Sequence, residues 1–163
     1  MTPEDLVEIE LIKPLKYRYL RCLDQKLWDV METCFTPDAT ARYGGGLYEF
    51  DGRDAIMEFL RTSMGATTML SSHRCHHPEI DLVGDGLATG VWALEDTVIL
   101  TDMGVNVQGA AFYTDHYVKV DGDWRIQHTG YRRTYEELMP RSAIAGLKLT
   151  ADWWVTDGRS TLG

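Results

Sequence analysis

The sequence is poor in basic residues and in long apolar runs. Its 16 Lys and Arg stand against 25 Asp and Glu, which gives a formal net charge of −9 and a pI of about 4.9. Nucleic acids and anionic membrane surfaces are bound through clustered basic residues, so neither is an expected partner. No uncharged apolar run approaches the roughly 20 residues of a membrane-spanning helix. The acidic segment Met1–Asp5 is also unlike a secretory signal.

Cysteine is also scarce. The three cysteines, Cys22, Cys34 and Cys75, are odd in number and lack CxxC spacing. We therefore expect free thiols in a cytoplasmic protein rather than a disulfide framework or a zinc site. The remaining composition, 44% hydrophobic and 25% charged, is typical of a globular protein, and 163 residues suffice for one domain with a substantial core.

The N-terminal third is predicted to be helical. Between Val7 and Leu27 apolar residues recur at helical spacing. Pro14 interrupts this pattern, so the helix is expected to begin near Pro14 or to bend there. A second, short helix is expected over 26–34. A third is expected to open at 51–54, where an Asp-Gly-Arg-Asp segment precedes an apolar stripe.

The chain beyond Gly65 is rich in β-formers. Short turns containing Gly and Asp separate its segments, which predicts hairpins and an antiparallel meander. The four segments are 69–83, 87–101, 105–120 and 124–134. Helices followed by a long sheet indicate an α+β fold. We expect a cone-shaped barrel in which a curved antiparallel sheet wraps around the N-terminal helices and leaves a cavity at its open end.

The domain is expected to span residues 1–140, with a C-terminal tail over 141–163. A short helix is possible over 143–149. Trp153 and Trp154 form a conspicuous apolar spot near the end of the tail. Exposed tryptophan is costly in water, so the tail is expected to dock on its own domain or on a neighbouring subunit.

The segment from Ser71 to Glu79 holds three of the five histidines. On a strand, His73, Cys75 and His77 would share one face. No further ligand at suitable spacing completes a metal site, so none is predicted. A histidine on the concave face is a candidate general base, although a histidine satisfied within the core is the more common case.

Three acids fall in apolar surroundings. Asp24 is expected near the end of the first helix, where the residue pattern alone favours an aspartate that caps the next helix or faces solvent. Glu95 and Asp96 interrupt an apolar strand and must point to opposite faces. The inward acid needs a cation, which Arg132 or Arg133 could supply.

Four tyrosines are expected to be core aromatics whose hydroxyls reach polar partners. They are Tyr19, Tyr43, Tyr113 and Tyr131. The sequence has no GxSxG motif and no glycine-rich phosphate loop. Any chemistry is therefore expected to be proton transfer without a bound cofactor.

Several stretches resemble the SnoaL-like members of the nuclear transport factor 2-like superfamily. The resemblance covers about residues 8 to 137, and it is closest to the bile acid 7α-dehydratases and more distant to scytalone dehydratases. The stretches that carry it are Arg18–Asp29, Phe35–Ala39, Phe50–Arg53, His73–Ile80, Trp92–Asp96, Gly109–Asp115 and Thr129–Glu137.

The resemblance implies a homo-oligomer, trimer or dimer, with a hydrophobic pocket and neither metal nor organic cofactor. Transferred residue by residue, it implies that His73, Asp24 and Tyr19 are catalytic. It implies that Tyr43, Asp96 and Arg133 contact the substrate, which leaves Arg132 as the alternative to Arg133.

The implied function is a dehydratase that removes water from a hydrophobic, polycyclic, steroid-like hydroxy ketone. His73 would act as the base, Asp24 would orient it, and Tyr19 would donate to the enolate oxygen. The alternatives are an isomerase or cyclase that uses the same residues, or a non-catalytic small-molecule binding protein.

Overall fold

Helix α1 (Pro3–Gln25) begins earlier than the sequence pattern predicts. The computed structural model describes residues 1–162. The Thr2 hydroxyl accepts from the Asp5 N–H and the Asp5 carboxylate accepts from the Thr2 N–H, a capping box that fixes the start at Pro3. Pro14 lies inside the helix, so the expected start near Pro14 is wrong. The buried apolar face on both sides of Pro14 offsets the hydrogen bond that proline cannot make.

The chain reverses sharply after α1. Lys26 takes a left-handed backbone conformation, with φ of 54°. Helix α2 (Trp28–Glu32) follows and is shorter than the expected segment 26–34. The helix that opens near Gly52 is α3 (Arg53–Met64), in agreement with the sequence.

Four long strands form the predicted antiparallel meander. They are β3 (Met69–Gly84), β4 (Leu87–Leu100), β5 (Val105–Val120) and β6 (Asp123–Pro140). The β5–β6 turn places Asp121 and Gly122 at positive φ, the conformation that two-residue hairpins require. The strand boundaries agree with the sequence except that β6 continues to Pro140.

Two further strands make the sheet mixed. β1 (Phe35–Tyr43) pairs with β2 (Tyr48–Asp51) antiparallel and with β6 parallel, in the order β2-β1-β6-β5-β4-β3. The expected cone of curved sheet and helices is confirmed, but the sheet is unclosed and one of its pairings is parallel. A pairing between strands so distant in sequence leaves no turn signal that would predict it.

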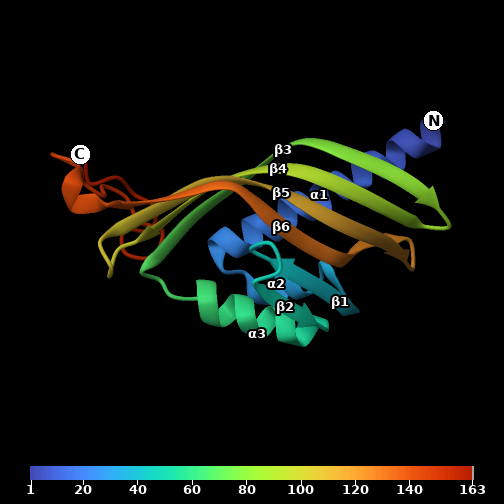
Figure 1. The fold of residues 1–163 in the computed structure, drawn as a ribbon, viewed down its shortest axis with the longest axis horizontal. Coiled ribbons are helices and arrows are strands. Elements are labelled where there is room, and N and C mark those ends of the chain that lie inside the picture. Colours follow the sequence, from blue (N-terminus) through green and yellow to red (C-terminus); the bar gives the residue numbers. More distant parts are fainter. Residues whose placement is uncertain (163) are drawn as a thin grey trace.

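The sheet arches over α1, and α3 lies on the side of α1 away from the meander (Figure 1). The core fills the concave side, with Ile12, Tyr19, Trp92 and Ile126 at most 1% exposed. β3–β6 extend past the helices toward the C-terminus (Figure 1). The tail there contains one 3-10 turn, Arg141–Ala143, and no helix over 143–149.

None of the helices within residues 1–162 combines the length and the apolar character needed to cross a membrane.

Candidate active site

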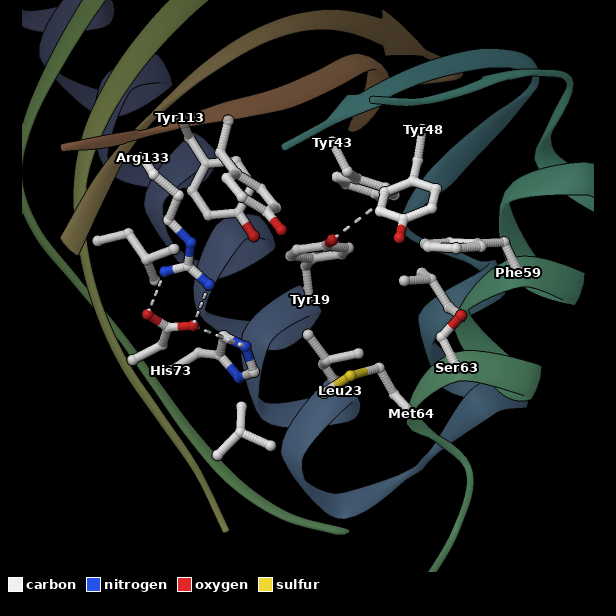
Figure 2. Close-up of a pocket in the computed structure, with 15 residues that line it drawn as sticks. Tyr19, Leu23, Tyr43, Tyr48, Phe59, Ser63, Met64, His73, Tyr113 and Arg133 are labelled. Atoms are coloured by element: carbon white, nitrogen blue, oxygen red, sulfur yellow. Dashed lines mark hydrogen bonds and ion pairs between the residues drawn. The ribbon is translucent and has the colours of Figure 1, made fainter. Parts of the chain in front are cut away.

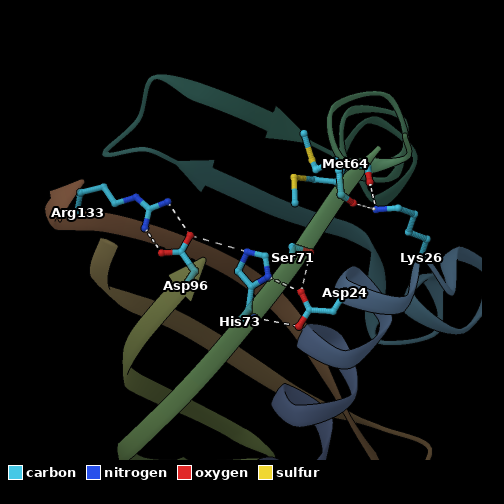
Figure 3. Close-up of polar contacts among 8 residues, drawn as sticks. Asp24, Lys26, Met64, Ser71, His73, Asp96 and Arg133 are labelled. Atoms are coloured by element: carbon cyan, nitrogen blue, oxygen red, sulfur yellow. Dashed lines mark hydrogen bonds and ion pairs between the residues drawn. The ribbon is translucent and has the colours of Figure 1, made fainter. Parts of the chain in front are cut away.

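Asp24 and His73 form a close acid–histidine pair. The Asp24 carboxylate, at the end of α1, accepts from the His73 backbone N–H over 2.9 Å and contacts His73 Nδ1 at 2.7 Å. The Ser71 hydroxyl donates to the same carboxylate over 2.8 Å (Figure 3). These contacts assign the proton of neutral His73 to Nδ1, which leaves Nε2 as a free base.

The charge on Asp24 is stabilised locally. Burial by itself raises the pKa of this carboxyl group, but the hydrogen bonds and charge interaction with His73, with help from Ser71, lower it below its ordinary value. Asp24 is therefore an anion at neutral pH. An anion at Nδ1 favours the imidazolium that forms when Nε2 takes a proton.

Asp96 lies on the other side of the imidazole. Its carboxylate is 3% exposed, and one of its oxygens lies 4.0 Å from His73 Nε2. Both terminal nitrogens of Arg133 donate to Asp96, one of them over 2.8 Å (Figure 3). The hydrogen bonds to Asp96 raise the pKa of Arg133 above its ordinary value, so the guanidinium is charged. Arg132 is exposed, which resolves the choice between the two arginines.

Buried tyrosines form the opposite wall. The hydroxyls of Tyr19 and Tyr43 lie 3.2 Å apart, and the Tyr113 ring meets the Tyr19 ring edge to face (Figure 2). Burial is the main cause that raises the pKa of all three hydroxyls well above their ordinary value. They are therefore protonated donors at neutral pH.

These groups surround one partly open cavity of about 140 Å³ (Figure 2). Five of the six candidate residues line it, and Asp24 lies behind His73. The lining consists of Tyr19, Leu23, Tyr43, Tyr48, Phe59, Leu60, Ser63, Met64, His73, Leu94, Asp96, Val98, Tyr113, Tyr131 and Arg133. The cavity is thus mainly apolar and aromatic, with its charges gathered at one end.

The expectation that His73, Cys75 and His77 share one face is wrong at His77. A bulge between His76 and Glu79 breaks the β3–β4 register, and His77 is exposed with φ of 47°. The extra residues shift the alternation of the strand. Residues 1–162 contain no group of three or more His, Cys, Asp or Glu side chains arranged to hold a metal ion.

The sequence did not single out every residue at the site. Ser71 lies two positions before His73, so strand alternation could have indicated its shared face. Tyr48 and Phe59 come from β2 and α3, and nothing in the sequence pattern connects them with the cavity.

A second buried group of polar side chains was also missed. Lys16 and Asp115 form a fully buried ion pair at 2.8 Å, and the Lys16 ammonium lies 3.3 Å from the centre of the Tyr113 ring. Tyr117 and Thr129 donate to Asp115, both over 2.7 Å. A lysine on the apolar face of the first helix was the available signal.

The comparisons with known proteins agree with this fold. The sequence matches the SnoaL-like domain family over residues 4–130, and the chain belongs to that family. The expected nuclear transport factor 2-like fold is thereby confirmed. The particular likeness to bile acid 7α-dehydratases stays a prediction.

Solved structures with the same fold include three instructive cases. A proposed scytalone dehydratase from Novosphingobium aromaticivorans is 26% identical over 84% of this chain and 91% of its own, with a TM-score of 0.78. A protein of unknown function from Mycobacterium tuberculosis is 27% identical over 82% of this chain and 76% of its own, with a TM-score of 0.69. The hexachlorocyclohexane dehydrochlorinase LinA-type3 from Novosphingobium barchaimii is 17% identical over 89% of this chain and 95% of its own, with a TM-score of 0.75. At this identity the likeness shows the fold alone.

Proposed function

We propose that this protein is a lyase that eliminates water from a neutral, hydrophobic hydroxy ketone by acid–base catalysis. The observation that carries the proposal is the His73 imidazole. Its Nδ1 is held by Asp24, and its Nε2 faces a cavity with buried hydroxyl donors. The name of the proposed scytalone dehydratase, which denotes an elimination of water, supports this reaction class.

Proton removal is the first step. His73 Nε2 takes a proton from the carbon next to the substrate carbonyl, and the electron pair of the C–H bond moves toward the carbonyl oxygen. The resulting imidazolium lies between the carboxylates of Asp24 and Asp96. Positioned acid–base transfer of this kind contributes about 10²–10⁴-fold to the rate.

The buried tyrosines would stabilise the enolate. Tyr19 and Tyr43 share a 3.2 Å contact, so one hydroxyl can donate to the other while the second donates to the substrate oxygen. At a mainly apolar cavity, one such donor is worth about 10²–10³-fold in kcat. We assign this role to Tyr19, assisted by Tyr43.

Departure of the hydroxyl completes the reaction. The enolate re-forms the carbonyl, the C–O bond breaks, and the proton on His73 Nε2 passes to the leaving oxygen to give water. Asp96, fixed by Arg133, orients the imidazolium for this second transfer. The atoms balance with side-chain proton transfer alone, so the proposed chemistry requires no metal or organic cofactor.

The charges favour a neutral substrate. Arg133 is shared between Asp96 and Glu136, and Asp24 adds another carboxylate, so anionic groups outnumber cations around His73. A carboxylate or phosphate on the substrate would be repelled from this end. The enclosed cavity, about 140 Å³, is close in size to cavities that hold benzene, so it suits about one ring. A polycyclic, steroid-like substrate would extend through the open side.

The test is turnover of a panel of neutral hydroxy-enone steroids and smaller bicyclic hydroxy ketones, followed by absorbance and mass. We expect loss of water and a new conjugated chromophore with wild type. We expect a drop of about 10³-fold or more with His73→Gln. His76→Gln is the matched control, since His76 faces Glu95 away from the cavity.

The outcomes separate the reaction classes. Equal activity of wild type and His73→Gln would show the assignment to be wrong. An altered chromophore at unchanged mass would favour an isomerase that uses the same base.

A further inference from the structure

Lys26 connects three elements next to the candidate active site. It follows Asp24 by two positions at the end of α1, and its ammonium donates to the backbone carbonyls of Met64 over 2.6 Å and Met69 over 3.0 Å. Figure 3 shows this side chain reaching from α1 toward Met64 while Asp24 contacts His73 on β3. Lys26 therefore joins the two ends of the connection between α3 and β3 through hydrogen bonds.

Both ends of that segment belong to the site. The Met64 side chain lines the cavity, and Met69 begins β3 shortly before Ser71 and His73. A displacement of either carbonyl would therefore reach the cavity wall or the residues that hold Asp24.

The identity of residue 26 points to a role for its side chain. A left-handed position after a helix favours glycine or asparagine, because a Cβ is disfavoured there. Burial also lowers the pKa of Lys26, partly opposed by the charge of Asp24. The backbone and the burial both disfavour lysine at this position, and the two carbonyl contacts provide a compensating interaction.

The C-terminal tail covers the same ammonium. The Trp154 ring centre lies 5.7 Å from Lys26 Nζ, within cation–π range. The Asp152 carboxylate accepts from the Trp154 and Val155 N–H groups over 2.7 and 3.0 Å, which orders the turn. The loop that contains this turn is closed by a 2.7 Å hydrogen bond from Thr161 N–H to the Thr150 carbonyl.

The tail also faces the outer side of the acid–histidine pair. A crevice is lined by Asp24 and Ser71 on one side and by Trp153 and Trp154 on the other. The docked loop thus lies over the side of Asp24 that does not contact His73.

We infer that Lys26 is a positioning residue for Asp24 and His73, and that Trp154 holds it in place from the docked C-terminal loop. The inference rests on the proposed function, since it concerns the same catalytic pair. It makes residues 150–161 part of the working site, although none of them lines the cavity.

The first experiment measures hydrogen exchange at the His73 amide, which donates to Asp24 on an edge strand. We expect exchange to accelerate about tenfold or more in Lys26→Met, through local opening. Lys26→Arg, which retains donors for both carbonyls, should stay near wild type. The Thr129 amide in β6 is the internal reference. Unchanged His73 exchange in Lys26→Met would overturn the inference.

The second experiment compares neighbouring positions of the tail. Trp154→Ala is expected to accelerate His73 exchange, whereas Val155→Ala, at a side chain 80% exposed and outside the crevice, is the control. In the Lys26→Met background, Trp154→Ala should add little, because the two residues act through one contact. Equal effects of Trp154→Ala and Val155→Ala would overturn the role of Trp154. These variants also keep the test open if Lys26→Met fails to fold.

Kinetics separate this inference from the proposed function. With any substrate of the panel, Lys26→Met should lower kcat about tenfold or more and change KM less, as expected for misplaced acid–base groups. If His73→Gln abolishes turnover while Lys26→Met leaves kcat and exchange unchanged, the function stands and the positioning role is wrong. If His73→Gln leaves turnover unchanged, the proposed function fails, and exchange alone then decides whether Lys26 orders the pair.

Discussion

His73 and Asp96 are direct partners in the β3–β4 ladder. Residues opposite one another on antiparallel strands project to the same face, so both side chains enter the cavity. Asp96 is also the ladder partner of Gly109 on β5. A Cβ at Gly109 would lie 3.3 Å from an Arg133 terminal nitrogen and 2.5 Å from the Tyr135 carbonyl oxygen. The absence of a side chain there leaves room for the arginine to reach Asp96.

The ion pair of Arg133 with Asp96 should contribute to the stability of the fold. We expect Arg133→Met to lower the free energy of unfolding by about 3 kcal/mol, because it leaves a buried carboxylate without its cation. Turnover should also fall, since Asp96 no longer keeps its place beside His73. Urea unfolding followed by fluorescence provides the measurement. Arg132→Met is the matched control and should change stability by no more than about 0.5 kcal/mol, and equal losses in both variants would contradict the assignment.

The ionisation of Asp24 should make the free energy of unfolding depend on pH. Its pKa is lower in the folded protein than its ordinary value, so its stabilising contribution is fully present above that ordinary value. The contribution is lost as the pH falls through the folded pKa. At neutral pH we expect Asp24→Asn to cost about 1–2 kcal/mol, and the difference from wild type should shrink in acid.

The measurement for Asp24 is urea unfolding of both proteins from neutral pH into acid. Asp29→Asn, at a carboxylate 97% exposed, is the control. A difference between wild type and Asp24→Asn that stays constant over the whole range would show that the charge of Asp24 does not contribute.

Much of this architecture follows from local patterns. Strand alternation predicts that Asp96 and Glu95 face opposite sides, and the turn residues predict the meander. Alternation also predicts that Arg133 shares a face with Tyr131, but the sequence does not show which face is concave. That choice depends on the curvature of the whole sheet.

Contacts between segments that are distant in the sequence could not be predicted from the sequence pattern. No turn connects β1 directly with β6, so the sequence has no local signal that predicts their parallel pairing. The bulge after His76 is defined by the register between β3 and β4. Lys26 likewise resembles any helix-end residue until Met64 and Met69 are brought beside it. Tyr19 and Asp24 were predicted as site residues because of the resemblance to a known family, not because of the spacing of residues in the sequence.

The hydroxyl of Tyr19 should matter for rate more than for folding. We expect Tyr19→Phe to lower kcat by about 10²-fold, because the enolate loses its main donor. The free energy of unfolding should change by about 1 kcal/mol, the usual effect of one hydrogen bond. Steady-state kinetics and urea unfolding measure the two effects. Tyr17→Phe is the matched control on the same helix, since Tyr17 is 50% exposed, and a similar kcat in both variants would remove Tyr19 from the mechanism.

The use of one imidazole for both proton transfers predicts the stereochemistry of the elimination. His73 Nε2 occupies one end of the cavity, so the carbon-bound proton and the hydroxyl must leave from the same face of the substrate. Substrates labelled with deuterium on one face or the other test this by mass spectrometry of the product. We expect loss of the label that is syn to the hydroxyl and retention of the label that is anti. The opposite result would require a second proton donor across the cavity, where the tyrosine hydroxyls lie, and would reassign the final transfer from His73 to one of them.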